Sequence, residues 1–259
     1  MKKSLFTALA LMFTLSLASC GGKQQVELHI FAAASMTETM DEIIENYKSK
    51  APGVTVIPTY DSSGTLLRQI REGADCDLFL SAAQKQMNAL DEAGSLLEGT
   101  RLDLLENKVT LAVPEGNPKG IKTFDQLAEL LKSGDVLLAM GNSDVPVGQY
   151  TQKIFSYYGL DEAALSEAGV LTYGSNVKEV ATQVSEAAVD CGVIYATDAA
   201  SAGLTAVDTA SPEMCGQVIY PAAVLAGSGH PEEARAFLNY LQTAGSAKIF
   251  EGVGFTALN

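Results

Sequence analysis

Two short stretches place serine hydroxyls where helical patterns begin: residues 31–35 (FAAAS) and residues 60–65 (YDSSGT). Each stretch follows an apolar, strand-like run. The first turn of a helix carries backbone N–H groups without intrahelical partners, together with the positive end of the helix dipole. Two such starts that converge can hold one small anion through neutral donors alone. The sequence therefore indicates an anion site built from these serines and the amides around them.

Two further junctions of this kind occur at residues 145–148 (VPVG) and 175–177 (SNV). In open α/β sheets the helix starts lie at the carboxyl ends of the strands, where ligands bind. Tyr195 ends its own strand-like run and can direct its hydroxyl to the same place. The resulting set contains hydrogen-bond donors only, which are serine hydroxyls, backbone amides and a phenol.

Each of these residues also has an ordinary structural interpretation. Residues 35–38 (SMTE) match a capping box, in which the serine hydroxyl bonds the amide three residues on. Asp61, Ser62 and Ser63 are common helix caps and turn formers. Tyr195 follows a valine–isoleucine pair, which is typical of a half-buried core residue. The residues alone leave both interpretations open.

Signals for catalysis are weaker. Residues 175–178 (SNVK) match the S-x-x-K pattern of penicillin-recognising serine enzymes, but neither S-D-N nor K-T-G follows. The two histidines, His29 and His230, lie near no motif-like serine or cysteine, and no zinc or EF-hand spacing occurs. We expect no metal cation site, and an extracytoplasmic serine enzyme using Ser175 and Lys178 remains an alternative.

The N-terminal segment predicts export. Lys2 and Lys3 precede an apolar run at residues 5–17, which is too short to span a membrane as a mature helix. The run closes with residues 17–20 (LASC), which resemble a bacterial lipobox. The alternative is an ordinary signal peptide with a chance cysteine.

Cleavage at the lipobox would remove residues 1–19 as a signal peptide and leave residues 20–25 as a lipidated tether. Acylation of the Cys20 thiol and its new amine would attach the chain to the membrane. Two acyl chains anchor more firmly than one, whose binding is marginal. We therefore expect an extracytoplasmic protein, lipid-anchored to the periplasmic side of a membrane or to the cell surface.

Composition narrows the function further. The formal net charge is −14, and no basic stripe is present, which argues against nucleic-acid binding. With Cys20 lipidated, an odd number of cysteines remains, without metal-like spacing: Cys76, Cys191 and Cys215. They fit either a disulfide between Cys191 and Cys215 or three buried thiols.

Strand-like and helical periods alternate along the body of the chain, which predicts an α/β fold with mostly parallel sheets covered by helices. Strands are expected at residues 26–31, 54–57, 77–80, 109–113, 136–140, 170–173, 192–195 and 218–225. Helices are expected at residues 36–47, 65–72, 84–93, 124–132, 149–158, 177–188 and 231–241. One large sheet and two smaller sheets that face a cleft fit this pattern equally well.

The chain resembles the molybdate-binding receptors of ABC importers over essentially its whole mature length. The matching stretches are FAAAS (31–35), DSSGTLLRQIREGADCDLFLSA (61–82), VPVGQY (145–150), CGVIYATDA (191–199) and IYPAAVL (219–225). The resemblance implies a type II periplasmic-binding-protein fold, in which crossing strands join two α/β lobes around a ligand cleft. The first lobe would comprise residues 26–106 plus 218–259, and the second residues 107–217.

The resemblance also implies which residues hold the oxyanion. Hydroxyl groups and backbone N–H groups would bind it, from Ser35, Ser63, Val147, Val177 and Tyr195. The two serines would donate through hydroxyl and N–H, the valines through N–H, and the tyrosine through its phenol. The chain departs from the family pattern at Val147, where alanine is frequent, and at Gly64, where a third serine is frequent. Gly64 would either loosen the loop or permit a closer approach.

The function implied is a receptor that captures molybdate, and tungstate too, and delivers it to the membrane permease of an ABC importer. We expect a monomer with no catalytic activity and no cofactor, attached to the lipid bilayer through Cys20. A donor-only site disfavours hydrogen phosphate, because its proton needs an acceptor. A receptor for another small anion such as sulfate is the alternative.

Overall fold

The computed structural model describes residues 25–258. The predicted signal peptide and Cys20 lie outside these residues. Within them, no helix combines the length and apolar character needed to cross a membrane.

The first of two sheets has six strands in the order β11-β4-β10-β3-β1-β2. These strands are β1 (Val26–Ala33), β2 (Val54–Asp61), β3 (Leu78–Leu80), β4 (Leu102–Asn107), β10 (Val218–Val224) and β11 (Thr256–Ala257). β1 runs parallel to β2 and β3, whereas β10 runs antiparallel to β3 and β4. We call this sheet and its helices the first lobe.

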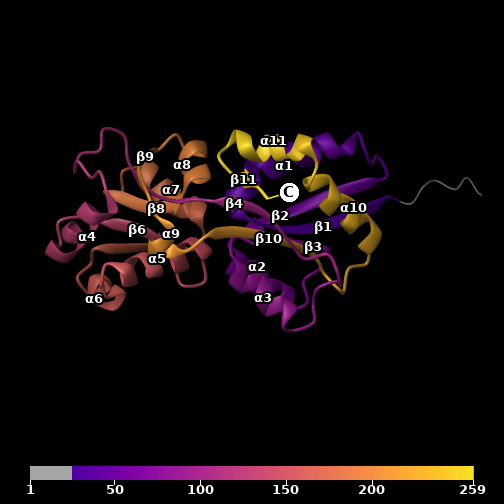
Figure 1. Ribbon diagram of the computed structural model, residues 1–259, viewed down its shortest axis with the longest axis horizontal. Coiled ribbons are helices and arrows are strands. Elements are labelled where there is room, and N and C mark those ends of the chain that lie inside the picture. The colour runs from indigo at the N-terminus through magenta and orange to yellow at the C-terminus, as the bar shows by residue number, and fades with distance from the viewer. Residues whose placement is uncertain (1–24, 259) are drawn as a thin grey trace, which may run out of the picture.

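The second sheet has five strands in the order β7-β6-β8-β5-β9. They are β5 (Val109–Val113), β6 (Leu138–Gly141), β7 (Leu171–Gly174), β8 (Cys191–Tyr195) and β9 (Thr205–Thr209). β6 runs parallel to β7 and β8, and β5 runs antiparallel to β8 and β9. This sheet and its helices form the second lobe, on the left of Figure 1.

Helices cover both sheets (Figure 1). The first lobe has η1 (Ala34–Met36), α1 (Thr37–Lys48), α2 (Ser63–Arg71), α3 (Gln84–Asp91), α10 (Pro231–Leu241) and α11 (Ala244–Gly252). The second lobe has α4 (Phe124–Ser133), α5 (Pro146–Tyr157), α6 (Glu162–Glu167), α7 (Val177–Ser185), α8 (Ala196–Ser201) and α9 (Pro212–Cys215). The chain passes between the lobes twice, from β4 into β5 and from α9 into β10.

The core follows the apolar periodicity of the sequence. Leu28 and Ile30 of β1 and Met40 and Ile43 of α1 are fully buried in one continuous cluster. Their alternate and i, i+3 spacings place these side chains on one face of each element. Burial of this kind fixes where β1 ends and α1 begins, and therefore positions the turn between them.

The predicted two-lobed α/β fold is confirmed, with corrections of detail. The sheets are mixed rather than mostly parallel, because the crossing strands β10 and β5 run antiparallel to their neighbours. The helix expected from residue 149 begins at Pro146, since proline is well suited to the first helical position. The elements β4, β9, β11, α6, α8, α9 and α11 were not predicted.

Of the two predictions for the cysteines, the structure shows the three buried thiols rather than a disulfide. Cys76, Cys191 and Cys215 are free and buried. Burial raises the pKa of the Cys76 thiol to about 12. These thiols are therefore protonated and pack as small apolar side chains.

Candidate functional site

All five residues of the predicted site border one small cavity between the lobes. Its complete lining is Ala33, Ala34, Ser35, Asp61, Ser62, Ser63, Ala82, Val145, Pro146, Val147, Val177 and Tyr195. The first lobe contributes the starts of η1 and α2, and the second lobe contributes the starts of α5 and α7 and the end of β8. The centre of a water-sized sphere can move through about 10 Å³ of the cavity, which is roughly the space that one water needs.

Ser35 is the second residue of η1 and is buried. Its Oγ lies 2.9 Å from the hydroxyl oxygen of Tyr220. In the described chain neither η1 nor α1 has a side-chain cap. The capping-box interpretation is therefore wrong, because the 3₁₀ turn at residues 34–36 makes Met36 the N-cap of α1.

The two serines at the start of α2 have different roles. Ser62 is the N-cap, and its Oγ accepts from the N–H of Thr65 at 3.2 Å. Ser63 is the first helical residue and has no exposed surface. Its Oγ accepts from the N–H of Ala82 at 2.9 Å. The structural interpretation thus holds for Ser62, while the Ser63 hydroxyl keeps its own proton available.

Val147 and Val177 contribute backbone rather than side-chain chemistry. Val147 is the second residue of α5 and Val177 the first residue of α7, and both side chains are buried. Amides in the first turn of a helix have no intrahelical acceptor. Asn176 caps α7 by accepting from the N–H of Glu179 at 3.0 Å. A Cβ on Gly148 would lie 2.2 Å from the carbonyl oxygen of Gly141, so glycine permits the start of α5 to pack against β6.

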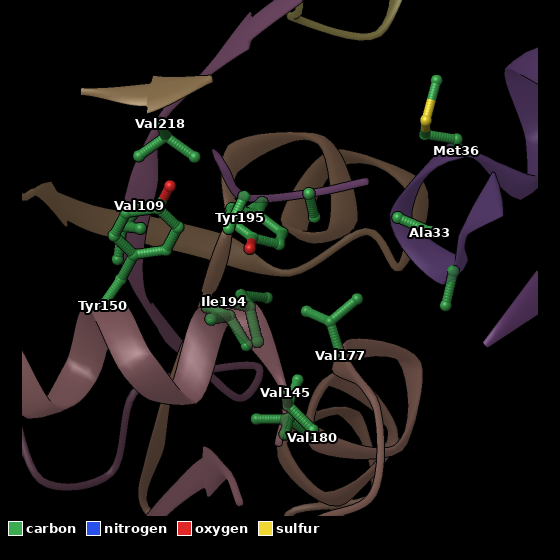
Figure 2. Packing of buried hydrophobic residues seen from close by; sticks show 14 of the residues in the cluster. Ala33, Met36, Val109, Val145, Tyr150, Val177, Val180, Ile194, Tyr195 and Val218 are labelled. Atoms are coloured by element: carbon green, nitrogen blue, oxygen red, sulfur yellow. The ribbon is translucent and has the colours of Figure 1, made fainter. Parts of the chain in front are cut away.

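Tyr195 ends β8 and is 1% exposed, so it is fully rather than half buried. Its ring packs against those of Tyr150 and Tyr220, with centroids 6.4 and 5.7 Å away. Figure 2 shows Tyr195 beside Tyr150, with Val177 pointing toward the same interior. The Tyr195 hydroxyl has no hydrogen-bond partner among the described residues. Burial raises its pKa well above the usual value, so the phenol stays protonated and can donate.

The lining of the cavity is almost entirely neutral. Asp61 is the only charged side chain among the described residues that border it. The Asp61 Oδ1 already accepts from the N–H of Ser62 at 2.7 Å and from Nδ2 of Asn176 at 3.5 Å. No group of three or more His, Cys, Asp or Glu in residues 25–258 is placed to hold a metal ion. The arrangement suits a small anion bound by hydrogen bonds.

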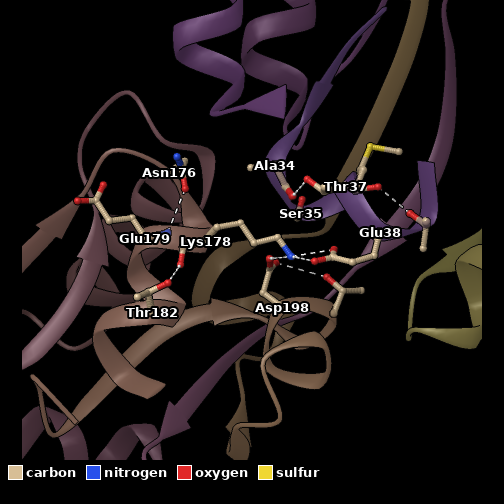
Figure 3. A network of polar contacts seen from close by, with 12 residues as sticks. Ala34, Ser35, Thr37, Glu38, Asn176, Lys178, Glu179, Thr182 and Asp198 are labelled. Carbon is tan, nitrogen blue, oxygen red and sulfur yellow. Dashed lines mark hydrogen bonds and ion pairs between the residues drawn. The ribbon is translucent and has the colours of Figure 1, made fainter. Parts of the chain in front are cut away.

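Sequence reasoning missed an ion-pair network beside this cavity (Figure 3). Nζ of Lys178, on α7, lies 2.7 and 2.8 Å from the carboxylate oxygens of Glu38, on α1. It also lies 3.5 Å from Oδ1 of Asp198, whose side chain is fully buried. Burial raises the pKa of the Asp198 carboxyl to about 7, against the opposing effect of Lys178. The network joins the two lobes, and no local sequence pattern indicates it, because Glu38 and Lys178 are 140 residues apart.

The same geometry removes the basis for a serine–lysine pair. The Ser175 hydroxyl donates to the Glu179 carboxylate at 2.7 Å. Lys178 is occupied by Glu38 and Asp198 instead. Ser175 and Lys178 therefore do not form the nucleophile and base that the S-x-x-K match suggested.

A second contact between the lobes involves Gly64, in the first turn of α2. A Cβ there would lie 2.1 Å from the carbonyl oxygen of Asp144, just before α5. Nearby, Nη1 of Arg68 lies 3.3 Å from the Asp144 carboxylate. Of the two effects expected for Gly64, the structure shows the closer approach.

Comparisons with known proteins show which family the chain belongs to. A family model described as bacterial extracellular solute-binding protein matches residues 28–256. YvgL of Bacillus subtilis, provisionally named an ABC transporter substrate-binding lipoprotein, is 34% identical over 99% of this chain and 98% of its own. The molybdate-binding protein ModA of Escherichia coli is 32% identical over 98% of this chain and 97% of its own.

Solved structures give the same result. A Clostridium difficile substrate-binding domain, provisionally named for a molybdenum ABC transporter, has a TM-score of 0.67 at 32% identity. The match covers 90% of this chain and 100% of that one. The Azotobacter vinelandii periplasmic molybdate-binding protein has a TM-score of 0.75 at 19% identity, over 88% of this chain and 98% of that one. At that identity the second likeness bears on the fold alone.

Proposed function

The chain belongs to the bacterial extracellular solute-binding protein family, a family of binding proteins rather than enzymes, and we propose that it is a molybdate receptor. Its fold is the two-lobed α/β fold of periplasmic binding proteins. The observation that carries the proposal is the convergence of Ser35, Ser63, Val147, Val177 and Tyr195 on one cavity. Relatives named as molybdate-binding proteins support the choice of ligand.

In this proposal the five residues surround the oxyanion with donors. Each donor binds a ligand oxygen. Ser35 and Ser63 donate through their hydroxyl and N–H groups, Val147 and Val177 donate through their N–H groups, and Tyr195 donates through its phenol. Hydrogen bonds to a charged partner are roughly twice as strong as neutral ones, and they strengthen where water is excluded. A dianion can therefore be held without lysine or arginine in the lining.

The same donors account for selectivity. Hydrogen phosphate carries a proton that needs an acceptor, which none of the five residues offers, and Oδ1 of Asp61, the carboxylate on the lining, already accepts from Ser62 and Asn176. Tungstate has the charge and shape of molybdate and is proposed as a second ligand, whereas sulfate is smaller and would leave the donors too far away.

Delivery requires the lobes to close on the ligand and the receptor to stay at the membrane. We assign residues 26–106 plus 218–259 to the first lobe and residues 107–217 to the second, so that the boundary falls at Asn107, the last residue of β4. A ligand shifts the equilibrium toward the state that it binds better, and the permease of an ABC importer would recognise that closed state. Acylation of Cys20 would anchor the monomer to the extracytoplasmic face of the membrane.

Calorimetric titration of the soluble form beginning at Gly21 tests the proposal. Molybdate, tungstate, sulfate and phosphate are each titrated into the same protein. We expect tight one-to-one binding of molybdate and tungstate and no heat of binding from sulfate or phosphate. Comparable binding of sulfate, or no binding of any of the four anions, would overturn the assignment of the ligand.

A further inference from the structure

A chain of buried hydrogen bonds runs from Ser35 into the interior of the molecule. Oγ of Ser35 lies 2.9 Å from the Tyr220 hydroxyl oxygen. Nδ2 of Asn107 lies 3.2 Å from that same oxygen and 3.0 Å from Oγ1 of Thr197. All four residues are at most 5% exposed. Because no water competes for buried groups, each hydrogen in the chain has few alternative acceptors.

The Asn107 amide sets the direction of this chain. Its Oδ1 accepts from the N–H of Lys108 at 2.8 Å, which places the NH₂ group toward the two hydroxyls. An amide NH₂ group only donates, so Tyr220 and Thr197 both accept from it. Tyr220 has a single proton, and Ser35 Oγ, 2.9 Å away, is an acceptor within hydrogen-bond distance. A Tyr220 hydroxyl that accepts from Asn107 can give its own proton to Ser35, whose Oγ would then be the acceptor.

We propose that Asn107 and Tyr220 are positioning residues that turn the Ser35 hydroxyl into a donor toward the cavity. This inference rests on the proposed oxyanion site. Since Tyr220 fills an acceptor position of Ser35 Oγ, the proton of Ser35 remains for the ligand. Without Asn107, Tyr220 could accept from Ser35 instead and take that proton away from the cavity.

The Ser63 hydroxyl also accepts a hydrogen bond from inside the protein, but from a backbone N–H group rather than from a tyrosine. Its Oγ accepts from the N–H of Ala82 at 2.9 Å, so its proton is also free to point into the cavity. Both serines are thus supplied with an internal donor. With both hydroxyls donating into the cavity, the site would favour ligand oxygens that carry no proton.

The chain of buried hydrogen bonds also lies where the lobes are joined. Asn107 is the last residue of β4 and Tyr220 lies on β10, the two strands at which the chain passes between the lobes. Thr197 belongs to α8, in the second lobe. The proposed orientation of the Ser35 hydroxyl therefore depends on the two strands at which the chain passes between the lobes.

A double-mutant cycle on molybdate affinity tests the positioning role. Tyr220→Phe removes the donor to Ser35 and is expected to weaken molybdate binding by about fivefold to tenfold. In a Ser35→Ala background the same change is expected to cost less than about twofold, because no hydroxyl remains to be oriented. Asn107→Leu should show the same dependence on Ser35 and provides a second test if Tyr220→Phe does not fold.

Tyr158→Phe is the matched control. It removes a phenol that donates to Asp125 at 2.7 Å and does not border the cavity, so its affinity should equal that of the wild type. If Tyr220→Phe and Asn107→Leu weaken binding equally with and without the Ser35 hydroxyl, the positioning role is wrong and the receptor stands. If the wild-type protein binds neither molybdate nor tungstate, both proposals are wrong.

Discussion

Ser63 combines complete burial with a hydroxyl whose acceptor position is filled by the Ala82 N–H. Ser63→Ala removes a donor to a charged ligand, a loss of about 1.5–3 kcal/mol. It also leaves the Ala82 N–H without its acceptor. We expect molybdate affinity to fall by about tenfold or more, measured by calorimetry.

The control for Ser63 is a hydroxyl that only caps a helix. Thr123 caps α4 by accepting from the N–H of Gln126 at 3.1 Å, away from the cavity. Thr123→Ala should lower the free energy of unfolding by about 1 kcal/mol and leave affinity unchanged. Equal affinities of Ser63→Ala and wild type would contradict a ligand role for this hydroxyl.

Because the Asp198 carboxyl is buried, we expect the free energy of unfolding to depend on pH. Its pKa rises from the ordinary value of 3.8 to about 7 because the folded chain buries the carboxyl. The folded state therefore binds more protons than the unfolded state between these values, and the free energy of unfolding falls as pH rises from about 4 to about 7. The contribution is fully present below pH 4, lost above pH 7, and about 4 kcal/mol at most.

Asp198→Asn isolates this contribution, because asparagine mimics the protonated carboxyl. Urea denaturation at pH 5 and pH 8 should show a smaller change in the free energy of unfolding for the variant than for the wild type. Identical changes in the two proteins would show that the carboxyl does not titrate in this range.

At the scale of elements, Gly64 lets the start of α2 approach the segment before α5. A Cβ at this position would meet the Asp144 carbonyl oxygen at 2.1 Å. Gly64→Ala should push apart the helix starts that carry Ser63 and Val147, and we expect molybdate affinity to fall by about tenfold, the loss of roughly one charged hydrogen bond. Titration calorimetry measures this fall.

Gly252→Ala, near the end of α11, is the matched substitution, because a Cβ there meets nothing within 4 Å. It should bind molybdate as the wild type does. An unchanged affinity in Gly64→Ala would mean that the lobes need not approach this closely to hold the ligand.

The helix starts could be predicted because their chemistry is local. An apolar strand, a turn and a helical period adjoin in the sequence, and four such junctions indicated where unpaired amides would lie. The helical period nevertheless predicts α5 from residue 149, three residues after its start at Pro146, because the residues VPVG look like a turn. β11 has only two residues, too few for any period to be visible.

Contacts across the chain could not be predicted in this way. Ser35 and Tyr220 are 185 residues apart, and Glu38 and Lys178 are 140 apart. Nothing in either local pattern specifies the other partner. The local pattern likewise could not separate Ser62, which caps α2, from Ser63, which faces the cavity; the position of Ala82 in the fold decides it.

At the scale of the whole molecule, three polar contacts hold the lobes together around the cavity. They are Glu38 with Lys178, Arg68 with Asp144, and Asp61 with Asn176. Glu38–Lys178 and Asp61–Asn176 join residues at or beside helix starts in the two lobes, whereas Arg68 lies in the last turn of α2. In the proposed receptor, closure of the lobes would therefore also complete the donor set.

The Glu38–Lys178 pair should then slow the release of the ligand. Exposed ion pairs contribute about 0–1 kcal/mol, and Lys178 and Glu38 are 31% and 53% exposed, so Glu38→Gln is expected to raise the molybdate dissociation rate by no more than about fivefold. Salt screens such pairs, and the wild-type rate should rise with ionic strength more steeply than that of the variant. Stopped-flow displacement measures both dissociation rates.

Glu129→Gln, which breaks the pair with Lys132 inside α4, is the control and should leave the dissociation rate of molybdate unchanged. A dissociation rate in Glu38→Gln equal to that of the wild type at every salt concentration would mean that other contacts keep the lobes closed.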